Sequence, residues 1–372
     1  MTKRQKIFFC TDGVFPHAIG GMQRHTALLL EELGRINDAD YTVIHPHDKN
    51  VFDPKFGISE FPLNFTFEGN YMKACYDYSK LIYKILKEEQ PDVIYCQGFS
   101  VWYGLKEFAS RLIVNPHGLE PFQTNDLTSK IKTAPMRMLE RYQFKHAAKV
   151  VSLGGRLTDI LKAETTSPHK QIVVLPNAVN IIPKVNRNFD KDVLQLLFVG
   201  RFAFNKGINI LMDAVKELNN EGYKNRLHFN IVGKGPLYEQ YIKEYNFSNV
   251  TFVGFADDDK LAALYRENDL FVFPTLFEGM PTVVLEAMMA GMPIIVSDTG
   301  ATCELVDSQN GYLIESNNVR SLKWGIQSFY QLTASERIAL SEASYSRVME
   351  KFTWPAVAQK HIELFNSFRN SV

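Results

Sequence analysis

The sequence lacks the features that define several classes of protein. Its 372 residues contain 41 Lys plus Arg and 41 Asp plus Glu, so a formal net charge of zero gives nucleic acid no general attraction. No apolar run approaches the roughly 20 residues needed to cross a bilayer. Hydrophobic residues make up 45% of the chain, as in ordinary packed globular proteins. We therefore expect a folded chain with no nucleic-acid partner and no membrane-spanning segment.

Cysteine is scarce and widely spaced. Because the four cysteines stand at positions 10, 75, 96 and 303, the sequence contains no CxxC pair for a metal or a redox reaction. A disulfide framework is not expected in so long a chain. The apolar stretch at 7–10 is much shorter than the core of a signal peptide. These features predict a cytoplasmic protein.

Short β-branched or aromatic runs alternate with longer stretches whose apolar residues recur at spacings of three and four. This rhythm is typical of βαβ units, which build doubly wound parallel sheets of the α/β class. The first helix is predicted at about 22–33. Strands are predicted at 6–10, 41–45, 92–96, 112–115, 150–153 and 172–175, and again at 194–199, 227–232, 250–253, 270–273, 294–297 and 312–314.

The run IIPKVNRNFDKD interrupts this rhythm between the two sets of strands. It contains a proline, several charges and no periodicity, so it is predicted to be a linker at 181–192. The predicted domains are then residues 1–180 and 193–353, each resembling a Rossmann domain. The remaining residues, 354–372, are predicted to form a last helix after the break at Trp354 and Pro355.

Two loops that follow predicted strands carry glycine where an anion could approach the main chain. Gly20 and Gly21 precede the first helix, where main-chain N–H groups can face a phosphate, although a tight turn is the more frequent explanation of such a pair. The loop VGRFAFNKG combines Gly200 with Arg201 and Lys206. Two cations beside a glycine suit a diphosphate, and surface ion pairs are the alternative.

The stretch FEGMPTVVLEAMM carries the most information. Glu278 and Glu286 are separated by seven residues, and a helix is predicted from about Thr282. The positive end of that helix could bind an anion, while each carboxylate could accept hydrogen bonds from sugar hydroxyls. Glu286 stands among apolar residues, where a charge needs a partner. This pattern favours a binding site for a phosphorylated sugar compound.

His117, in the sequence NPHGLE, is a further candidate. A histidine beyond a strand end could position or polarise a reacting group near neutral pH, although a structural role is the alternative. Two runs have the Asp-x-Asp pattern of metal sites, at Asp38 to Asp40 and Asp257 to Asp259. The first precedes a strand and the second starts a predicted helix, where acidic residues are favoured. We therefore predict no metal site.

A basic segment lies between Lys130 and Lys149. Six Lys and Arg residues stand there against Glu140 alone, a balance of +5, with methionine and aromatic residues interleaved. The pattern is consistent with a basic amphipathic helix on an anionic membrane surface. A helix whose charged side faces solvent is the alternative.

Taken together and in order, these motifs resemble the retaining glycosyltransferases of family 4, which have the GT-B fold of two facing Rossmann-like domains. The resemblance covers nearly the whole chain. Its most specific part is EGMPTVVLE followed by AMMAGMPIIVSDTGATCELV and the Asn310-Gly311 pair. Supporting motifs are the Gly20-Gly21 pair, HGLE, LPNAVN, the VGR to NKG loop and the Phe352-Thr353-Trp354 entry to the final helix.

The resemblance implies that a nucleotide diphosphate sugar, the donor, lies mostly on the second domain. Arg201 and Lys206 would neutralise the diphosphate leaving group, and Glu286 would hold the ribose diol. The sugar and phosphates would be held by Glu278 and by main-chain N–H groups of Gly279, Met280, Thr282 and Val283, beside Gly200.

On the first domain, His117 would lie near the transferred sugar, and Gly20 with Gly21 would close over the phosphates. The last helix would return to this domain. The sequence departs from the family pattern at Gln23, where the family often has Glu. The resemblance therefore says less about how the acceptor is bound.

Transfer with retained anomeric configuration is implied, with front-face attack and the departing phosphate as base. Because fixed cations can stabilise the leaving group, no metal or other cofactor is required. The implied acceptor is a glycan or lipid-linked intermediate, which would place the enzyme in the cytoplasm or at the inner face of the membrane.

Two alternatives remain open within the same fold. The chain could be a sugar-nucleotide epimerase or hydrolase, which glycosylates no acceptor, or an inactive sugar-nucleotide-binding subunit. A dehydrogenase is discarded, because the nearest match to GxGxxG, at 233–238, lacks the third glycine.

Overall fold

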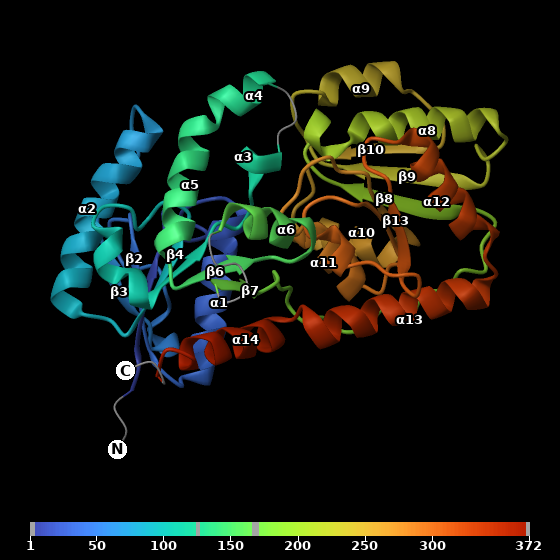
Figure 1. The fold of residues 1–372 in the computed structure, drawn as a ribbon. Helices are drawn as coiled ribbons and strands as arrows, with labels where there is room; N and C mark the ends of the chain where they lie inside the picture. The colour runs from blue at the N-terminus through green and yellow to red at the C-terminus, as the bar shows by residue number, and fades with distance from the viewer. Residues whose placement is uncertain (1–3, 124–126, 166–170, 370–372) are drawn as a thin grey trace. The chain divides into compact units, whose positions relative to one another are not determined.

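The computed structural model describes residues 4–123, 127–165 and 171–369, and the chain forms two compact units (Figure 1). The first unit comprises Met1–Asn177 together with Trp354–Val372, and the second comprises Ala178–Thr353. The predicted return of the C-terminal helix to the first unit is therefore confirmed. Figure 1 shows that helix, α14 (Trp354–Asn366), beside α1 (Gly21–Ile36), with which it is in contact.

The first unit is built on one parallel sheet of seven strands in the order β3-β2-β1-β4-β5-β6-β7. The strands are β1 (Lys6–Cys10), β2 (Asp40–His45), β3 (Ser59–Pro62), β4 (Val93–Gln97), β5 (Leu112–Asn115), β6 (Lys149–Ser152) and β7 (Ile172–Val174). Its remaining helices are α2 (Tyr71–Glu89), α3 (Glu120–Gln123), α4 (Leu127–Lys132), α5 (Ala134–His146) and α6 (Gly155–Glu164), with short 3₁₀ turns η1 (Pro54–Phe56) and η2 (Leu105–Arg111).

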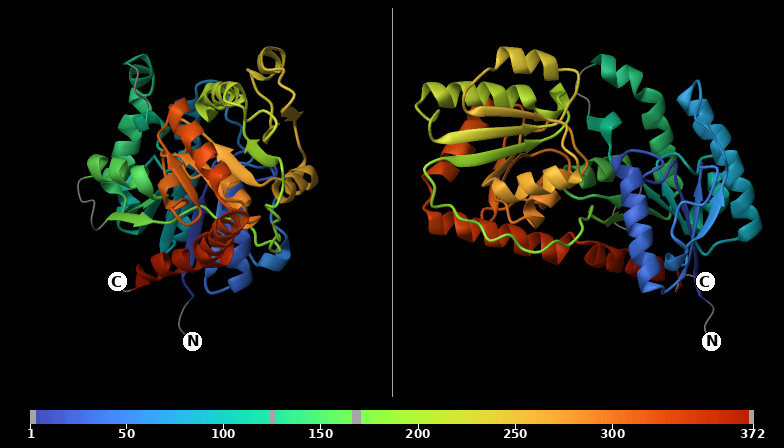
Figure 2. Two further views of the ribbon diagram at one scale, coloured as in Figure 1. Left: turned by 90° about the vertical axis from the view of Figure 1, so that its right-hand side faces the viewer. Right: turned by 180° about the vertical axis from the view of Figure 1, so that it is seen from behind.

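The second unit repeats this plan with six parallel strands in the order β10-β9-β8-β11-β12-β13 (Figure 2). The strands are β8 (Leu194–Val199), β9 (Leu227–Val232), β10 (Val250–Gly254), β11 (Leu270–Phe273), β12 (Ile294–Ser297) and β13 (Gly311–Ile314). The helices are α8 (Ile208–Asn220), α9 (Tyr238–Glu244), α10 (Asp258–Glu267), α11 (Thr282–Met289), α12 (Val319–Gln331) and α13 (Ala334–Lys351), with η3 (Phe204–Lys206) and η4 (Thr302–Glu304).

The strand sequences explain why these sheets are buried on both faces. Central strands such as LFVF in β11 and IIVS in β12 are apolar apart from Ser297, and every residue in them is buried. Such runs are typical of parallel sheets covered by helices on both sides. Every predicted strand is present to within one or two residues, so the predicted α/β doubly wound architecture is confirmed.

Strand order determines where ligands can bind. In each unit the chain reverses direction across the sheet between the first strand and its neighbour, at β1 and β4 in one and at β8 and β11 in the other. Loops at the carboxyl ends of such a strand pair diverge and leave a crevice in doubly wound folds. In the second unit these loops are 200–207 and 274–281, and they contain six of the predicted donor-site residues.

Two features of the first unit differ from the sequence expectations. Strand β3 was not predicted, because it is a partly exposed edge strand that ends in Pro62 and has no apolar run. The single basic helix expected between Lys130 and Lys149 is wrong: α4 ends at Lys132, Pro135 lies in the first turn of α5, and Lys149 begins β6. The segment 181–192, predicted to be a linker, forms no helix or strand, and its buried Phe189 contacts the ring of Phe329 in the second unit.

Candidate functional site

In the second unit, the two loops at the strand reversal meet through an ion pair. Lys206, at the end of η3, donates a hydrogen bond from Nζ to Oε1 of Glu278, which lies between β11 and α11. The side chains keep 25% and 13% of their surface exposed, so a ligand can reach them. Residues 72 positions apart in sequence are thus brought together as the parallel topology requires.

The loop that carries Glu278 is held from three sides. Thr275 Oγ1 lies 3.0 Å from the carbonyl oxygen of Asn205 and 3.3 Å from Glu278 Oε1. Gly207 has φ +69°, and a Cβ there would come within 1.8 Å of the Pro274 carbonyl oxygen. Gly300 has φ +54°, and its Cβ would lie 2.0 Å from the Glu278 carbonyl oxygen. Both positions therefore require glycine.

Helix α11 begins directly after this loop and has the apolar sequence TVVLEAMM. Its N-cap residue is Pro281, so in the described chain no side chain caps its first turn. The first N–H groups of a helix have no partners within it and carry the positive end of its dipole. Main-chain groups at Thr282 and Val283 thus stand at a helix end suited to a phosphate.

Glu286, one turn into α11, has the partner that its apolar surroundings demand. The hydroxyl of Tyr265, in α10, lies 3.0 Å from Glu286 Oε2 and 3.3 Å from the carbonyl oxygen of Val283. The hydrogen bond fixes the rotamer of the carboxylate. Tyr265 was missed by the sequence analysis, because nothing in the spacing of α10 indicates that its hydroxyl reaches α11.

The other predicted donor residues are placed as follows. Arg201 is exposed directly after Gly200 in the β8–α8 loop, at the same end of the sheet as Lys206. Met280 is buried, and Gly279 accepts a hydrogen bond from the N–H of Ala301. The structure therefore gathers the predicted donor residues of the second unit on two adjacent loops and the start of one helix.

In the first unit, His117 lies in a cluster of buried rings. Its ring centroid is 4.9 Å from that of His25, which in turn is 5.4 Å from Trp354 and 6.1 Å from His361. Trp354 and His361 come from α14, so the returning helix completes this cluster. His117 has φ +56°, a strained backbone for a non-glycine residue, and its N–H donates to Asn115 Oδ1 over 2.9 Å.

Burial keeps these imidazoles uncharged. Desolvation, with a further contribution from His361, lowers the pKa of His117 from 6.5 to about 3. Desolvation lowers the pKa of His361 to about 4, and it lowers the pKa of His25 well below its usual value. His117 is therefore uncharged at neutral pH, and a neutral imidazole can still accept or donate a hydrogen bond.

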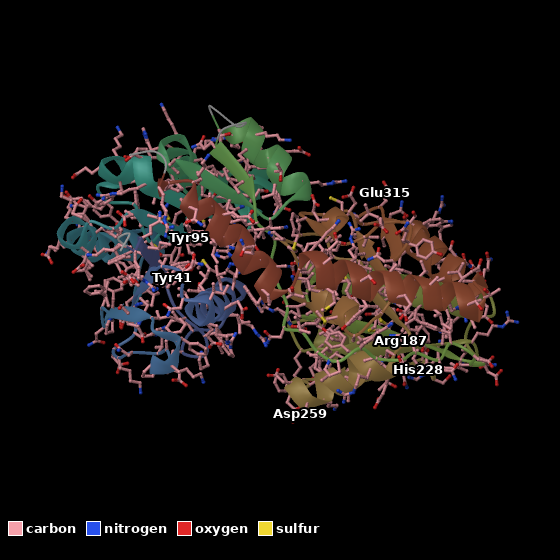
Figure 3. All side chains as sticks on the ribbon, turned by 90° about the horizontal axis from the view of Figure 1, so that it is seen from below. Tyr41, Tyr95, Arg187, His228, Asp259 and Glu315 are labelled. Atoms are coloured by element: carbon pink, nitrogen blue, oxygen red, sulfur yellow. The ribbon has the colours of Figure 1, made fainter. Side chains whose placement is uncertain are left out.

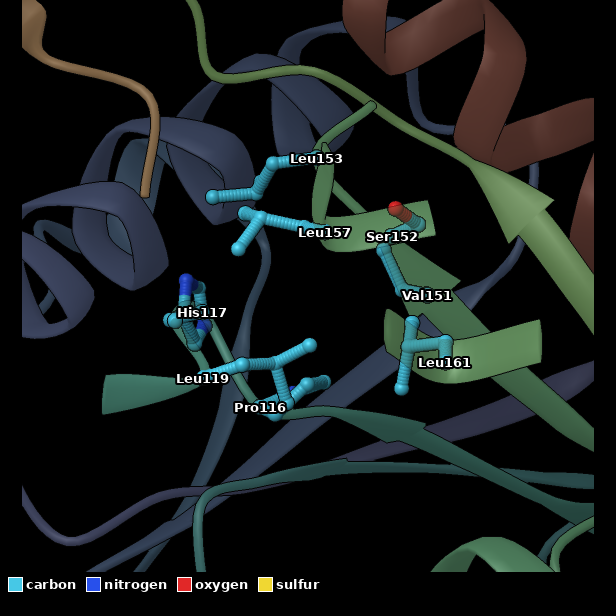
Figure 4. Close-up of a pocket in the computed structure, with 9 residues that line it drawn as sticks. Pro116, His117, Leu119, Val151, Ser152, Leu153, Leu157 and Leu161 are labelled. Carbon is cyan, nitrogen blue, oxygen red and sulfur yellow. The ribbon is translucent and has the colours of Figure 1, made fainter. Parts of the chain in front are cut away.

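A small pocket adjoins His117 in the first unit (Figure 4). It is lined mainly by Leu119, Leu157, Leu161 and Val151, and it has no room for a water molecule. Its apolar side chains lie against the HGLE loop, which contains His117. The pocket is too small to bind a sugar.

Gly20 and Gly21 also belong to the first unit and begin α1. A Cβ at Gly20 would meet Oε1 of Gln23 at 2.1 Å, whereas a Cβ at Gly21 would meet nothing within 4 Å. Gln23 itself donates from Nε2 to Asp12 Oδ1 over 2.8 Å. A Glu at this position, as the family often has, would place two carboxylates against each other.

The Asp-x-Asp runs have structural roles. Asp257 caps α10 by accepting a hydrogen bond from the N–H of Lys260, and Asp38 accepts one from the Tyr41 hydroxyl. Asp40 pairs with Arg4. Among the described residues, no group of three or more His, Cys, Asp or Glu side chains is arranged to hold a metal ion.

Both units match models of known protein families. Residues 19–181 match the family model described as Glycosyltransferase Family 4, and residues 194–331 match the one described as Glycosyl transferases group 1. Both units are glycosyltransferase domains. The matched segments contain the His117 cluster in the first case and the Lys206, Glu278 and Glu286 groups in the second.

Individual relatives agree with this assignment. The glycosyltransferase chain is 23% identical to an uncharacterized glycosyltransferase of Methanocaldococcus jannaschii, covering 94% of this chain and 95% of the relative. It is 27% identical to UDP-Gal:alpha-D-GlcNAc-diphosphoundecaprenol alpha-1,3-galactosyltransferase of Escherichia coli, covering 64% and 66%.

Solved structures share the fold over the whole chain. Sucrose-phosphate synthase from Thermosynechococcus elongatus aligns with a TM-score of 0.80 and 20% identity, covering 99% of this chain and 100% of the other. Anabaena HepE, solved in complex with UDP-glucose, aligns with a TM-score of 0.68 and 18% identity, covering 97% and 99%. The GT-B architecture predicted from the motifs is thus confirmed.

Proposed function

We propose that this glycosyltransferase moves a hexose from a nucleotide diphosphate sugar to a glycan or lipid-linked acceptor, with retention of configuration and without a metal ion. The observation that carries the proposal is the Lys206–Glu278 pair: Glu278 lies in the loop that leads into the uncapped start of α11, and Glu286 lies one turn into that helix. These groups supply a cation, helix N–H donors and two carboxylates, which are the kinds of partner that the phosphates and hydroxyls of a sugar nucleotide require.

The groups divide between the parts of the donor. The diphosphate would take hydrogen bonds from Lys206, Arg201 and the first N–H groups of α11, and the ribose diol would donate to Glu286. Glu278 would accept from hydroxyls of the transferred sugar. Because Lys206 already pairs with Glu278, the same contact would link the phosphate site to the sugar site.

The proposed reaction breaks the bond between the anomeric carbon and the phosphate oxygen, and it forms a bond from that carbon to an acceptor oxygen. The proton of the acceptor hydroxyl passes to the departing phosphate. Cations and helix dipoles that face the phosphate stabilise the charge that develops there. His117 is uncharged at neutral pH, so the role proposed for it is that of a hydrogen-bond partner and not of a cation.

The acceptor class is proposed from the curated relatives. The name of the E. coli relative specifies a sugar attached to diphosphoundecaprenol as its acceptor. A second relative is a putative colanic acid biosynthesis glycosyltransferase from E. coli, 24% identical over 47% of this chain. A lipid-linked glycan intermediate follows the first of these names, and it fits the basic segment of the first unit.

Product analysis tests the proposed reaction. A thermal-shift panel of UDP-, GDP- and ADP-sugars first identifies the donor, since a ligand that binds only the folded protein raises its melting temperature. With that donor and a lipid-linked acceptor, we expect transferred sugar whose anomeric configuration, read by NMR, matches that of the donor. Chelation with EDTA should leave the rate unchanged.

Other products would contradict the proposal. Isomerised or hydrolysed donor, formed at the same rate without acceptor, would instead identify an epimerase or hydrolase. Donor binding with no turnover would identify an inactive subunit. Loss of the rate in EDTA, restored by Mg²⁺ or Mn²⁺, would contradict metal independence alone.

We further propose that the first unit docks on an anionic membrane surface through α4 and the start of α5. Leu127, Ile131 and Met138 are 74%, 66% and 70% exposed, and they alternate with the exposed Lys130 and Lys132. Exposed apolar side chains between lysines suit the boundary between lipid headgroups and acyl chains. No helix among the described residues is long and apolar enough to span a bilayer.

Charge reversal tests this docking surface. Lys130→Glu with Lys132→Glu should weaken binding to vesicles of phosphatidylglycerol and phosphatidylcholine at least about 30-fold, because each lysine near such a surface contributes about 1 kcal/mol. Lys216→Glu with Lys243→Glu changes the net charge equally at exposed sites on α8 and α9. Vesicle flotation that responds equally to both double variants, or to neither, would remove the membrane proposal.

A further inference from the structure

The segment 181–192 carries an arginine with an unusual set of partners. Arg187 donates from Nε to the carbonyl oxygen of Gly291 over 2.9 Å, and from Nη2 to those of Tyr265 and Ala290 over 2.6 and 2.7 Å. Nη1 reaches the carbonyl oxygens of Asn268 and, at 3.5 Å, Arg266. Each of these hydrogen bonds goes to a main-chain carbonyl. Figure 3 labels Arg187 within the second unit.

These carbonyls belong to the C-terminal ends of two helices. Helix α10 ends at Glu267 and α11 at Met289, so Arg187 caps both at once. The last carbonyls of a helix have no partners within it and carry about half a negative charge. Two such ends together balance about one guanidinium charge. This balance explains how a half-buried arginine is tolerated with carbonyls as its partners.

The nearby carboxylate is already engaged elsewhere. Asp269 accepts a hydrogen bond from Lys191 Nζ over 2.7 Å and another from the N–H of Gln195 over 2.8 Å. Desolvation lowers the pKa of Arg187 to about 10, with Asp269 acting in the opposite direction. The guanidinium therefore stays charged at neutral pH, and its hydrogen bonds are committed to the two helix ends.

The same two helices carry the Tyr265–Glu286 contact. Tyr265 gives its carbonyl oxygen to Arg187, while its hydroxyl reaches Glu286 and Val283 on α11. The helix pair is thus joined twice, once through the Arg187 fork and once through the Tyr265 side chain. A shift of α10 relative to α11 would move the hydroxyl and release the carboxylate.

We infer that Arg187 is a positioning residue, which holds α10 against α11 so that Tyr265 orients Glu286 for the ribose of the donor. The inference rests on the proposed function, because it assigns Glu286 to the ribose diol. Arg187 itself touches neither donor nor acceptor in this scheme. Its contribution is the geometry of a carboxylate that must accept two hydrogen bonds from adjacent hydroxyls.

The test compares ribose and 2′-deoxyribose nucleotides. Dissociation constants of UDP, GDP and ADP and of their 2′-deoxy forms are measured by calorimetry, followed by KM and kcat for the matching sugar nucleotide. Wild-type protein should prefer one ribose form at least tenfold over its deoxy form. Arg187→Lys keeps the charge but loses the fork, and it should reduce this preference to less than threefold.

Two further readouts separate positioning from general loss of structure. In Arg187→Lys the KM for the donor should rise about tenfold, with kcat at saturation within threefold of wild type. Tyr265→Phe should lose the same preference, and combining it with Arg187→Lys should cause no further loss. The shared endpoint is expected because both changes act on one carboxylate.

Arg337→Lys is the matched control. Arg337 is buried and, like Arg187, donates to main-chain carbonyls, those of Phe329, Tyr330 and Phe189, but it caps α12. Its replacement should lower the melting temperature and leave the ribose preference intact. A preference that survives in Arg187→Lys, or that falls equally in Arg337→Lys, would overturn the inference. If wild type and Glu286→Ala showed the same preference for the ribose nucleotide over its 2′-deoxy form, the assignment of Glu286 to the ribose would be overturned, and the inference with it.

Discussion

Lys206→Ala is expected to lower kcat by about 10²- to 10³-fold, which corresponds to about 3 to 4 kcal/mol of transition-state stabilisation. Lys206 is one of two cations on the β8–α8 loop at the strand reversal of the second unit, and it is the one that contacts Glu278. A charge developing on the departing phosphate would lose a fixed positive partner. Glu278→Ala is expected to have an effect of similar size, since it releases the lysine and removes an acceptor for sugar hydroxyls.

The double variant separates a joint role from two independent ones. Because the two side chains form one hydrogen-bonded pair, Lys206→Ala combined with Glu278→Ala should be little slower than the slower single variant. Steady-state kinetics at saturating donor give the comparison.

A matched control is available in the same unit. Lys191 and Asp269 form an ion pair of 2.7 Å before β8 and β11, at the opposite ends of those strands from the proposed site. Lys191→Ala should leave kcat within about twofold of wild type. A wild-type rate in both Lys206→Ala and Glu278→Ala would remove these residues from the site.

The second large effect concerns acid stability. His361 is fully buried, with its Nε2 3.1 Å from the Tyr95 hydroxyl and its Nδ1 2.9 Å from the Val357 carbonyl oxygen. Its pKa is about 4 in the folded protein and 6.5 when unfolded. Between these values the unfolded chain binds a proton that the folded chain does not, so stability falls as pH falls.

The expected loss from His361 is about 3 kcal/mol of unfolding free energy between pH 6.5 and pH 4. His117 and His25 change in the same direction. Urea denaturation at a series of pH values, followed by a probe of the first unit such as Trp354 fluorescence, measures the slope. His361→Gln should be less stable at pH 7, because it disturbs the hydrogen bonds, and should lose less stability on acidification.

His17→Gln is the control for this experiment, since His17 is exposed in the same unit. It should keep the wild-type slope. Equal slopes for wild type and His361→Gln would show that the buried cluster does not control acid stability.

Much of the fold could be predicted from local pattern. Buried parallel strands such as LFVF and IIVS consist almost entirely of apolar residues, because both faces of the sheet are covered. Such runs can be recognised in the sequence. The edge strand β3 was not predicted, because it is partly exposed, ends in Pro62 and has no apolar run. The split of the basic segment into α4 and α5 places Pro135 in the first turn of α5, where proline is tolerated.

The site could be predicted only in part. Positions of Lys206, Glu278 and Glu286 followed from their places after strands, because parallel topology collects those loops at one edge. Their partners did not follow. The Tyr265–Glu286 bond, the Arg187 fork and the contact of Gly300 with the Glu278 carbonyl oxygen all join residues that are distant in sequence. Such contacts depend on helix placement, which periodicity does not specify.

The charge state of His117 also depends on residues that are distant in sequence, so it could not be predicted. Its sequence context, a histidine after a strand, gave no sign that His25 and His361 would enclose it. That enclosure depends on α14, which begins more than 200 residues later in the chain.

A crystal structure of the chain with the nucleoside diphosphate selected by the thermal-shift panel tests the central claim most directly. We predict phosphate oxygens within hydrogen-bonding distance of Lys206 Nζ and of the first N–H groups of α11, and a ribose whose two hydroxyls donate to Glu286. A nucleotide bound elsewhere, with the Lys206–Glu278 pair and the Tyr265–Glu286 contact untouched, would contradict the account.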